Sequence, residues 1–158
     1  PISAIGKRAC DRAGEDFVSS ENFSYADALE TAKTLCAKFA AGEFDRLGIL
    51  CTRYVSMMSQ TAEVRWILPL AAEEKGDTGV IFEPDAATIL DAAVPTFVAG
   101  KLFAAVRESF ASEVAARRVA MDAAGKNAQT MIDDLQLEYN RARQSTITQE
   151  ITEIVAGS

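Results

Sequence analysis

The sequence contains no histidine, so the commonest general base and the commonest imidazole metal ligand are both missing. Its three cysteines, Cys10, Cys36 and Cys51, match no CxxC or zinc spacing. Each lies in an apolar or helical context, so we expect three buried structural thiols in a reducing compartment. We therefore predict no metal site and no cofactor.

Positive charge is scarce as well. Lys and Arg total 16 against 23 acidic residues, which gives a net charge of -7. Nucleic-acid binding depends on a cationic surface, so this balance argues against a nucleic-acid partner. Long apolar runs are also missing, because the longest uncharged stretch, 92–100, is far shorter than the roughly 20 residues that span a bilayer. We expect no direct membrane span.

The chain carries no recognisable catalytic motif. Gly6, Gly14 and Gly42 form neither a GxGxxG nor a GxxxxGK[ST] loop. The adjacent carboxylates at 73–74 and 133–134 are expected on a loop and on an exposed helix, where no apolar enclosure would shift their pKa values. We therefore predict a protein that is not itself an enzyme.

The first half of the chain has the pattern of a small α/β domain. Helices are expected at 7–13 and, after a Ser24 N-cap, from residue 25 to a stop at Gly42. Strands are expected at 47–58 and 62–70, and shorter ones at 2–5, 16–20 and 80–83. A polar loop is expected at 71–79. The order strand, helix, strand favours parallel strand pairs joined by helices.

The second half reads as one long helix. After an Asp85 N-cap, residues 86–156 contain no decisive break, although Pro95 is expected to kink or restart the helix. Apolar residues recur every seven positions and form a seam, at Val114, Met121, Ala128, Leu135 and Ala142. This seam predicts a coiled coil with a segment outside the chain or with a second copy. The alternative is a helix packed on its own domain.

Beyond Ala142 the apolar residues move to another face of the helix. Ile147, Ile151, Ile154 and Val155 form a stripe displaced by about 140° from Ala142. A helix that continued the same coiled coil would keep its face. The C-terminal tip is therefore expected to meet something other than the partner of the seam.

Four stretches carry a resemblance to a known family: YNRARQSTITQEITEIV (139–155), ASEVAARRVAM (111–121), FEPD (82–85) and RYVSMMSQTAEVRWILPL (53–70). Together they resemble the gamma subunit of F-type ATP synthases, weakly before residue 40 and very specifically after 110. The resemblance implies a chain that begins at the second strand of that subunit, without its N-terminal helix and first strand. Asp122 departs from the family, which usually has a basic residue there, and no paired-cysteine regulatory insert is visible.

The fold that the resemblance implies is a small Rossmann-like α/β domain followed by a long C-terminal helix that forms half of a coiled coil. Residues 1–79 would be the partial α/β domain, and 80–110 would hold its final strand and the start of the long helix, a foot region. Residues 111–158 would be the coiled-coil shaft helix.

The function that the resemblance implies is a non-catalytic rotor shaft. It would transmit torque between a proton-driven membrane c-ring and the catalytic hexamer of alpha and beta subunits, during ATP synthesis or hydrolysis. Further partners would be the epsilon subunit and the N-terminal gamma helix. The subunit would be peripheral at the cytoplasmic face of the bacterial plasma membrane, or at its organelle equivalent.

The resemblance also implies contact residues. The tip stripe, Ile147, Ile151, Ile154 and Val155, would turn in an apolar sleeve of the hexamer. Other positions match residues that meet loops of the catalytic subunits or act in coupling: Arg117, Arg143, Gln144, Thr148 and Glu150. Glu83 and Asp85 would lie near the membrane ring. The competing interpretations are a solvated helix face at the tip and a plain acidic loop at the foot.

A different class of function also fits the heptad pattern. The chain could be a homodimeric coiled-coil adaptor protein with a small α/β domain. That interpretation leaves the change of face at Ala142 unexplained.

Overall fold

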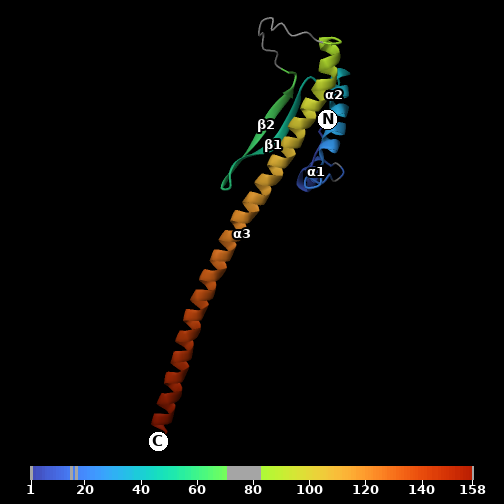
Figure 1. The fold of residues 1–158 in the computed structure, drawn as a ribbon. Coiled ribbons are helices and arrows are strands. Elements are labelled where there is room, and N and C mark those ends of the chain that lie inside the picture. The colour runs from blue at the N-terminus through green and yellow to red at the C-terminus, as the bar shows by residue number, and fades with distance from the viewer. Residues whose placement is uncertain (1, 15, 17, 71–82, 158) are drawn as a thin grey trace. The chain divides into compact units, whose positions relative to one another are not determined.

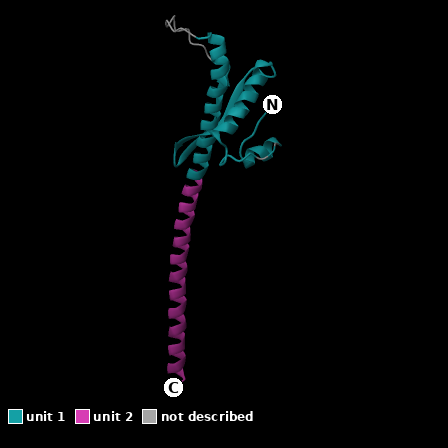
Figure 2. Cartoon of the chain, turned by 45° about the vertical axis from the view of Figure 1, so that its right-hand side comes forward, with its two compact units in different colours: residues 1–115 teal, residues 116–158 magenta. Residues whose placement is uncertain are grey.

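The computed structural model describes residues 2–14, 16, 18–70 and 83–157. These residues form a mixed α/β structure with three helices and a two-stranded sheet (Figure 1). The chain divides into two compact units, unit 1 at Pro1–Ala115 and unit 2 at Ala116–Ser158 (Figure 2). The elements are α1 (Lys7–Ala13), α2 (Tyr25–Ala40), β1 (Leu47–Ser56), β2 (Ser59–Leu68) and α3 (Ala86–Ala156).

Helix α2 begins and packs as the sequence predicts. The Ser24 hydroxyl accepts the N–H of Asp27 at 3.2 Å, and the Asp27 carboxylate accepts the Ser24 N–H at 2.8 Å, which completes a capping box. The Ser24 backbone N–H, first, and the Ser24 hydroxyl donate to the Asp27 carboxylate and lower its pKa. Ala28 and Ala32 are fully buried. Beyond the helix, Gly42 adopts a positive φ of 76°, which suits glycine at a helix end.

Strands β1 and β2 form an antiparallel hairpin, with Leu50 opposite Val64. The sequence pattern predicts the connection at 59–61, and this prediction is wrong, because the chain turns at Met57 and Met58. The amide nitrogen of Gln60 donates hydrogen bonds to the carbonyl oxygens of Ser56 and Met57, at 3.2 and 2.9 Å. Residues 59–61 therefore belong to β2, where Ser59 pairs with Ser56, Gln60 with Tyr54 and Thr61 with Arg53.

The short strands expected near the N-terminus are not found. Residues 2–5 adopt no strand, and neither do the described residues of 16–20. A backbone hydrogen bond from Gly6 N–H to Val18 O, at 2.8 Å, joins the residue that follows the first stretch to the second. The parallel pairs expected from the sequence are thus absent from the part of the chain that the structure describes, where β1–β2 is the one sheet. The predicted loop at 71–79 and residues 80–82 of the predicted strand at 80–83 lie outside the described residues.

Helix α3 begins where predicted and does not restart at Pro95. The Asp85 carboxylate accepts hydrogen bonds from the N–H of Thr88 at 2.9 Å and from its hydroxyl at 2.8 Å. The same bonds, first of all the backbone one, lower the pKa of Asp85. Proline in a helix forfeits one hydrogen bond, yet the helix is continuous over 71 residues. Val94 and Val98 on either side of Pro95 pack into the core, which favours continuation.

The core of unit 1 joins α2, β2 and α3. Ala28, Ala32 and Ala99 are completely buried, and such small residues permit close approach of helices. The larger side chains around them fill the remaining space. The buried members of the core are Phe23, Ala28, Ala32, Ile67, Leu68, Val98, Ala99, Leu102 and Val106.

Part of α3 is apolar enough, by length and composition, to cross a membrane. An 18-residue window of it reaches a mean hydropathy of 1.6, and 28% of that window is buried inside the protein. Val98, Ala99, Leu102 and Val106 lie in the core of unit 1, so core packing accounts for part of the apolar content of the helix.

Candidate functional site

The C-terminal end of α3, in unit 2, presents the predicted tip stripe to solvent. Ile147 is 45% exposed, Ile151 56%, Ile154 72% and Val155 70%. Large apolar side chains gain stability by leaving water, so four of them on one short stretch mark a candidate contact surface. The four residues lie on the long helix that the sequence predicts, and their contact with the hexamer stays a prediction.

The polar residues of the tip are less available for hydrogen bonding than their number suggests. The hydroxyls of Thr146, Thr148 and Thr152 donate to backbone carbonyl oxygens one turn earlier, at 3.1, 2.8 and 2.8 Å. Each threonine thus satisfies its hydroxyl within its own helix. Arg143, Gln144 and Glu150 are exposed on the same stretch, and so is Arg117 near the start of unit 2.

The seam of the predicted coiled coil is also exposed. Val114, in unit 1, is 43% exposed, while in unit 2 Met121 is 69% and Leu135 62% exposed. Ala128 and Ala142 are exposed too. Asp122, which departs from the pattern, pairs with Lys126 one turn later at 2.9 Å. The coiled coil itself stays a prediction.

In unit 1 a cluster of polar side chains ties the hairpin to α3, and the sequence analysis missed it. The Glu108 carboxylate bonds the Arg65 guanidinium at 2.8 Å and accepts the N–H of Tyr54 at 3.1 Å. The hydroxyl of the next residue, Ser109, accepts the N–H of Thr52 at 3.0 Å. Two N–H groups on the open edge of β1 are thereby satisfied by side chains of α3. We call Glu108, Ser109 and Arg65 the edge clamp.

Opposite charges strengthen the hydrogen bonds between Arg65 and Glu108 in the edge clamp. The Arg65 guanidinium holds the pKa of Glu108 below its usual range, and the Tyr54 N–H acts in the same direction. Glu108 and Glu63, which also pairs with Arg65, in turn raise the pKa of that arginine. The Arg65 and Glu108 side chains are only 32% and 27% exposed, so water screens their interaction less than that of a surface pair. Glu108 lies between Val106 and Ser112, two buried positions of α3. A charged residue so close to buried positions is the sequence feature that could have revealed the edge clamp.

The predicted foot residues lie before α3. Glu83 and Asp85 are both exposed. The Asp85 carboxylate is engaged as the N-cap described above. Their contact with a membrane ring stays a prediction.

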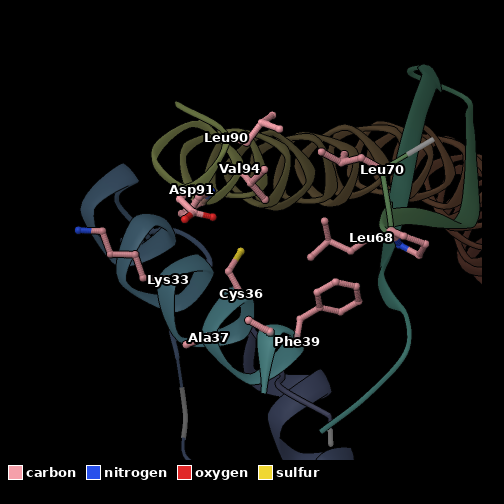
Figure 3. A pocket seen from close by; sticks show the side chains of 12 residues that line it. Lys33, Cys36, Ala37, Phe39, Leu68, Leu70, Leu90, Asp91 and Val94 are labelled. Carbon is pink, nitrogen blue, oxygen red and sulfur yellow. The ribbon is translucent and has the colours of Figure 1, made fainter. Parts of the chain in front are cut away.

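Unit 1 contains an open cavity of about 460 Å³ between α2, the end of β2 and the start of α3 (Figure 3). Its lining is mostly apolar, with Phe39, Leu68 and Val94 around the Cys36 thiol. Burial raises the pKa of Cys36, so this thiol stays protonated and weakly nucleophilic at neutral pH. Cys36 is only half-buried, which corrects the expectation of three buried thiols, whereas Cys10 and Cys51 are buried as predicted.

No group of three or more Cys, Asp or Glu side chains that could hold a metal ion occurs among the residues that the structure describes. The strongest ionic cluster, at Glu63, Arg65 and Glu108, is engaged in holding the hairpin.

Comparison with known proteins points to one family. A family model described as ATP synthase matches residues 2–158. The ATP synthase gamma chain of Ruminococcus albus is 38% identical over 168 residues, covering 99% of this chain and 59% of the relative. That of Xanthomonas campestris is 46% identical over 130 residues, covering 80% and 45%. The chain thus spans about half the length of these curated relatives.

A solved structure shares the fold. The rotor of the Euglena gracilis mitochondrial ATP synthase, in rotational state 1, matches with a TM-score of 0.55 over 90% of this chain and 61% of its own. At 18% identity this likeness bears on the fold alone. The family model, in contrast, extends over nearly the whole sequence, and the relatives named above are gamma chains. The chain therefore belongs to the ATP synthase gamma chain family.

Proposed function

We propose that this chain acts in the central rotor shaft of an F-type ATP synthase and transmits torque between a proton-driven membrane c-ring and the catalytic hexamer of alpha and beta subunits. The observation that carries the proposal is the exposed tip stripe, Ile147, Ile151, Ile154 and Val155, at the end of α3. Membership of the gamma chain family supplies the class of partner.

The chemistry of the tip suits a rotating contact. Apolar contacts are non-directional, so a shaft can turn in an apolar sleeve without breaking a fixed set of hydrogen bonds at each step. The hydroxyl protons of Thr146, Thr148 and Thr152 are engaged within the helix, so these residues, including the expected contact Thr148, would offer a partner only their acceptor lone pairs. Exposed Arg117, Arg143, Gln144 and Glu150 would supply the few polar contacts with the catalytic subunits.

The rest of the shaft would be completed by other segments. The seam from Val114 to Ala142 would pair with an N-terminal gamma helix, and the hairpin would belong to a Rossmann-like domain with further strands. Residues 1–79 would form the partial α/β domain, 80–110 the foot region and 111–158 the shaft helix. Glu83 and Asp85 would face the membrane ring, and an epsilon subunit would bind nearby.

The chain would need no cofactor and would perform no catalysis, since the shaft only changes the conformations of other subunits. It would lie at the periphery of the membrane, on the cytoplasmic face in a bacterium. The proposal thus assigns this chain a mechanical role.

The test is an Ile147→Asp substitution in the full-length gamma subunit within the assembled enzyme, with Ile147→Leu as the matched control. A carboxylate in an apolar sleeve is costly to desolvate, so the Asp variant should lose most of its coupled ATP synthesis. The Leu variant should keep it. Gln144→Ala should give a smaller loss. Normal ATP synthesis by the Ile147→Asp variant would refute the sleeve.

A further inference from the structure

The turn of the β1–β2 hairpin presents apolar side chains to solvent. Val55 is 59% exposed, Met57 43% and Met58 86%. We call these three residues the methionine turn. Two-residue hairpin turns usually carry Gly, Asn or Asp, so consecutive methionines at this position are unusual for a turn that only faces water.

The methionine turn is held in a fixed conformation. The Gln60 amide donates to the carbonyl oxygens of Ser56 and Met57, at 3.2 and 2.9 Å. A few residues away, the edge clamp fixes the strand through hydrogen bonds from Thr52 N–H to Ser109 and from Tyr54 N–H to Glu108. The apolar side chains are therefore presented on a rigid support, which reduces the entropy cost of contact with a partner.

The hairpin turn lies at the end of unit 1 from which α3 continues in sequence toward the proposed hexamer contacts. In both views the turn lies beside the part of α3 that leads to the end of unit 1 (Figures 1 and 2). Ser109, which bonds the hairpin, precedes Ala115, the last residue of unit 1, by about 9 Å of helix. Arg117, a proposed contact of the catalytic hexamer, follows Ala115 by only two residues in sequence.

We propose that the methionine turn is a second contact with the catalytic hexamer, against an apolar surface on the rim of the alpha and beta subunits. This inference rests on the proposed function, which brings the hexamer to the shaft. A rotating turn must meet several non-identical surfaces in succession. Methionine suits this task because its unbranched, polarisable side chain adapts to different apolar shapes.

The experiment uses photo-crosslinking in the assembled ATP synthase that contains the full-length gamma chain. A benzophenone maleimide is attached to a cysteine introduced by Met58→Cys, by Ile147→Cys or, as the exposed control on α2, by Glu30→Cys. Native Cys10, Cys36 and Cys51 are replaced by alanine or serine in all three. We expect Met58→Cys to crosslink to alpha or beta subunits several-fold more than Glu30→Cys does.

The two positions separate the two proposals. If Ile147→Cys crosslinks to alpha or beta but Met58→Cys crosslinks to the membrane ring, to a second gamma chain or to nothing, the rim contact is wrong and the rotor function stands. If Met58→Cys crosslinks and Ile147→Cys does not, the rim contact stands and the sleeve is wrong. Oxidation of native Met58 by peroxide gives an independent readout, and it should be slower in the complete enzyme than in a rotor freed of alpha and beta subunits.

Discussion

Glu108 of α3 contacts both strands of the hairpin. Its carboxylate binds Arg65 with one oxygen and caps the Tyr54 N–H with the other. The unpaired N–H groups of an open strand edge can otherwise form hydrogen bonds with a strand of another chain. Glu108, with Ser109, thus closes part of the edge of β1 and orients the hairpin turn at the same time.

Glu108→Gln should weaken the chain at neutral pH, because it replaces charge-assisted hydrogen bonds by neutral ones, at a cost of about 1–3 kcal/mol. The pKa of Glu108 is lowered from 4.5 in the folded protein, so its stabilisation is present above that value and is lost as pH falls through the lower folded pKa. The difference in unfolding free energy between the two proteins should therefore shrink below about pH 4.5. Urea unfolding followed at several pH values measures it.

Glu30→Gln, at an exposed position on α2, is the control for this series and should leave the curve unchanged. A gap between Glu108→Gln and the native chain that stayed constant from neutral to strongly acid pH would show that the carboxylate acts through its shape and not through its charge.

At the scale of elements, local chemistry predicted the helices well. Ser24, Gly42 and Asp85 were identified as helix boundaries from the sequence because capping depends on residues within a few positions of each other. The turn at Met57 was missed because methionine is not a turn-forming residue. The strands expected at 2–5 and 16–20 failed because an apolar run alone does not specify a strand without a neighbour to pair with.

Some residues of the candidate site could likewise be predicted from the sequence, and others could not. The tip stripe and the seam are periodic along one helix, so their positions follow from the sequence. The edge clamp joins Arg65 to Glu108, which lie 43 positions apart in the chain, and no local pattern brings such residues together. Contacts of this kind depend on the tertiary packing of the hairpin against α3.

Ser24→Ala tests the boundary of α2. Loss of the hydroxyl that accepts the Asp27 N–H should reduce the unfolding free energy by about 1 kcal/mol. The midpoint of urea unfolding should fall while the slope stays constant, because the surface exposed on unfolding is unchanged. Thr34→Ala, within the same helix, should have no such effect, since alanine favours a helix interior. An equal loss in both variants would contradict the capping role.

Across the whole molecule, the two units differ in how far their apolar side chains are exposed to solvent. Unit 1 buries residues from α2, β2 and α3 in one core. In unit 2, Met121, Met131, Ile132 and Leu135 are all more than half exposed. A helix whose apolar residues lie in water gains little from packing, and most helical stability in proteins comes from such packing. Burial of the seam against a partner would therefore stabilise this part of α3.

The seam should pair with an N-terminal gamma helix. A peptide with the sequence of the N-terminal gamma helix of a close relative should bind the chain in a one-to-one complex, detected by light scattering or sedimentation. Burial of each large apolar side chain contributes about 1.5–3 kcal/mol, so the double substitution Met121→Glu and Leu135→Glu should abolish binding. Met58→Glu, in the hairpin turn, should leave it intact. If the chain alone forms a stable dimer that the peptide does not dissociate, the seam pairs with a second copy, and the homodimeric adaptor becomes the better description.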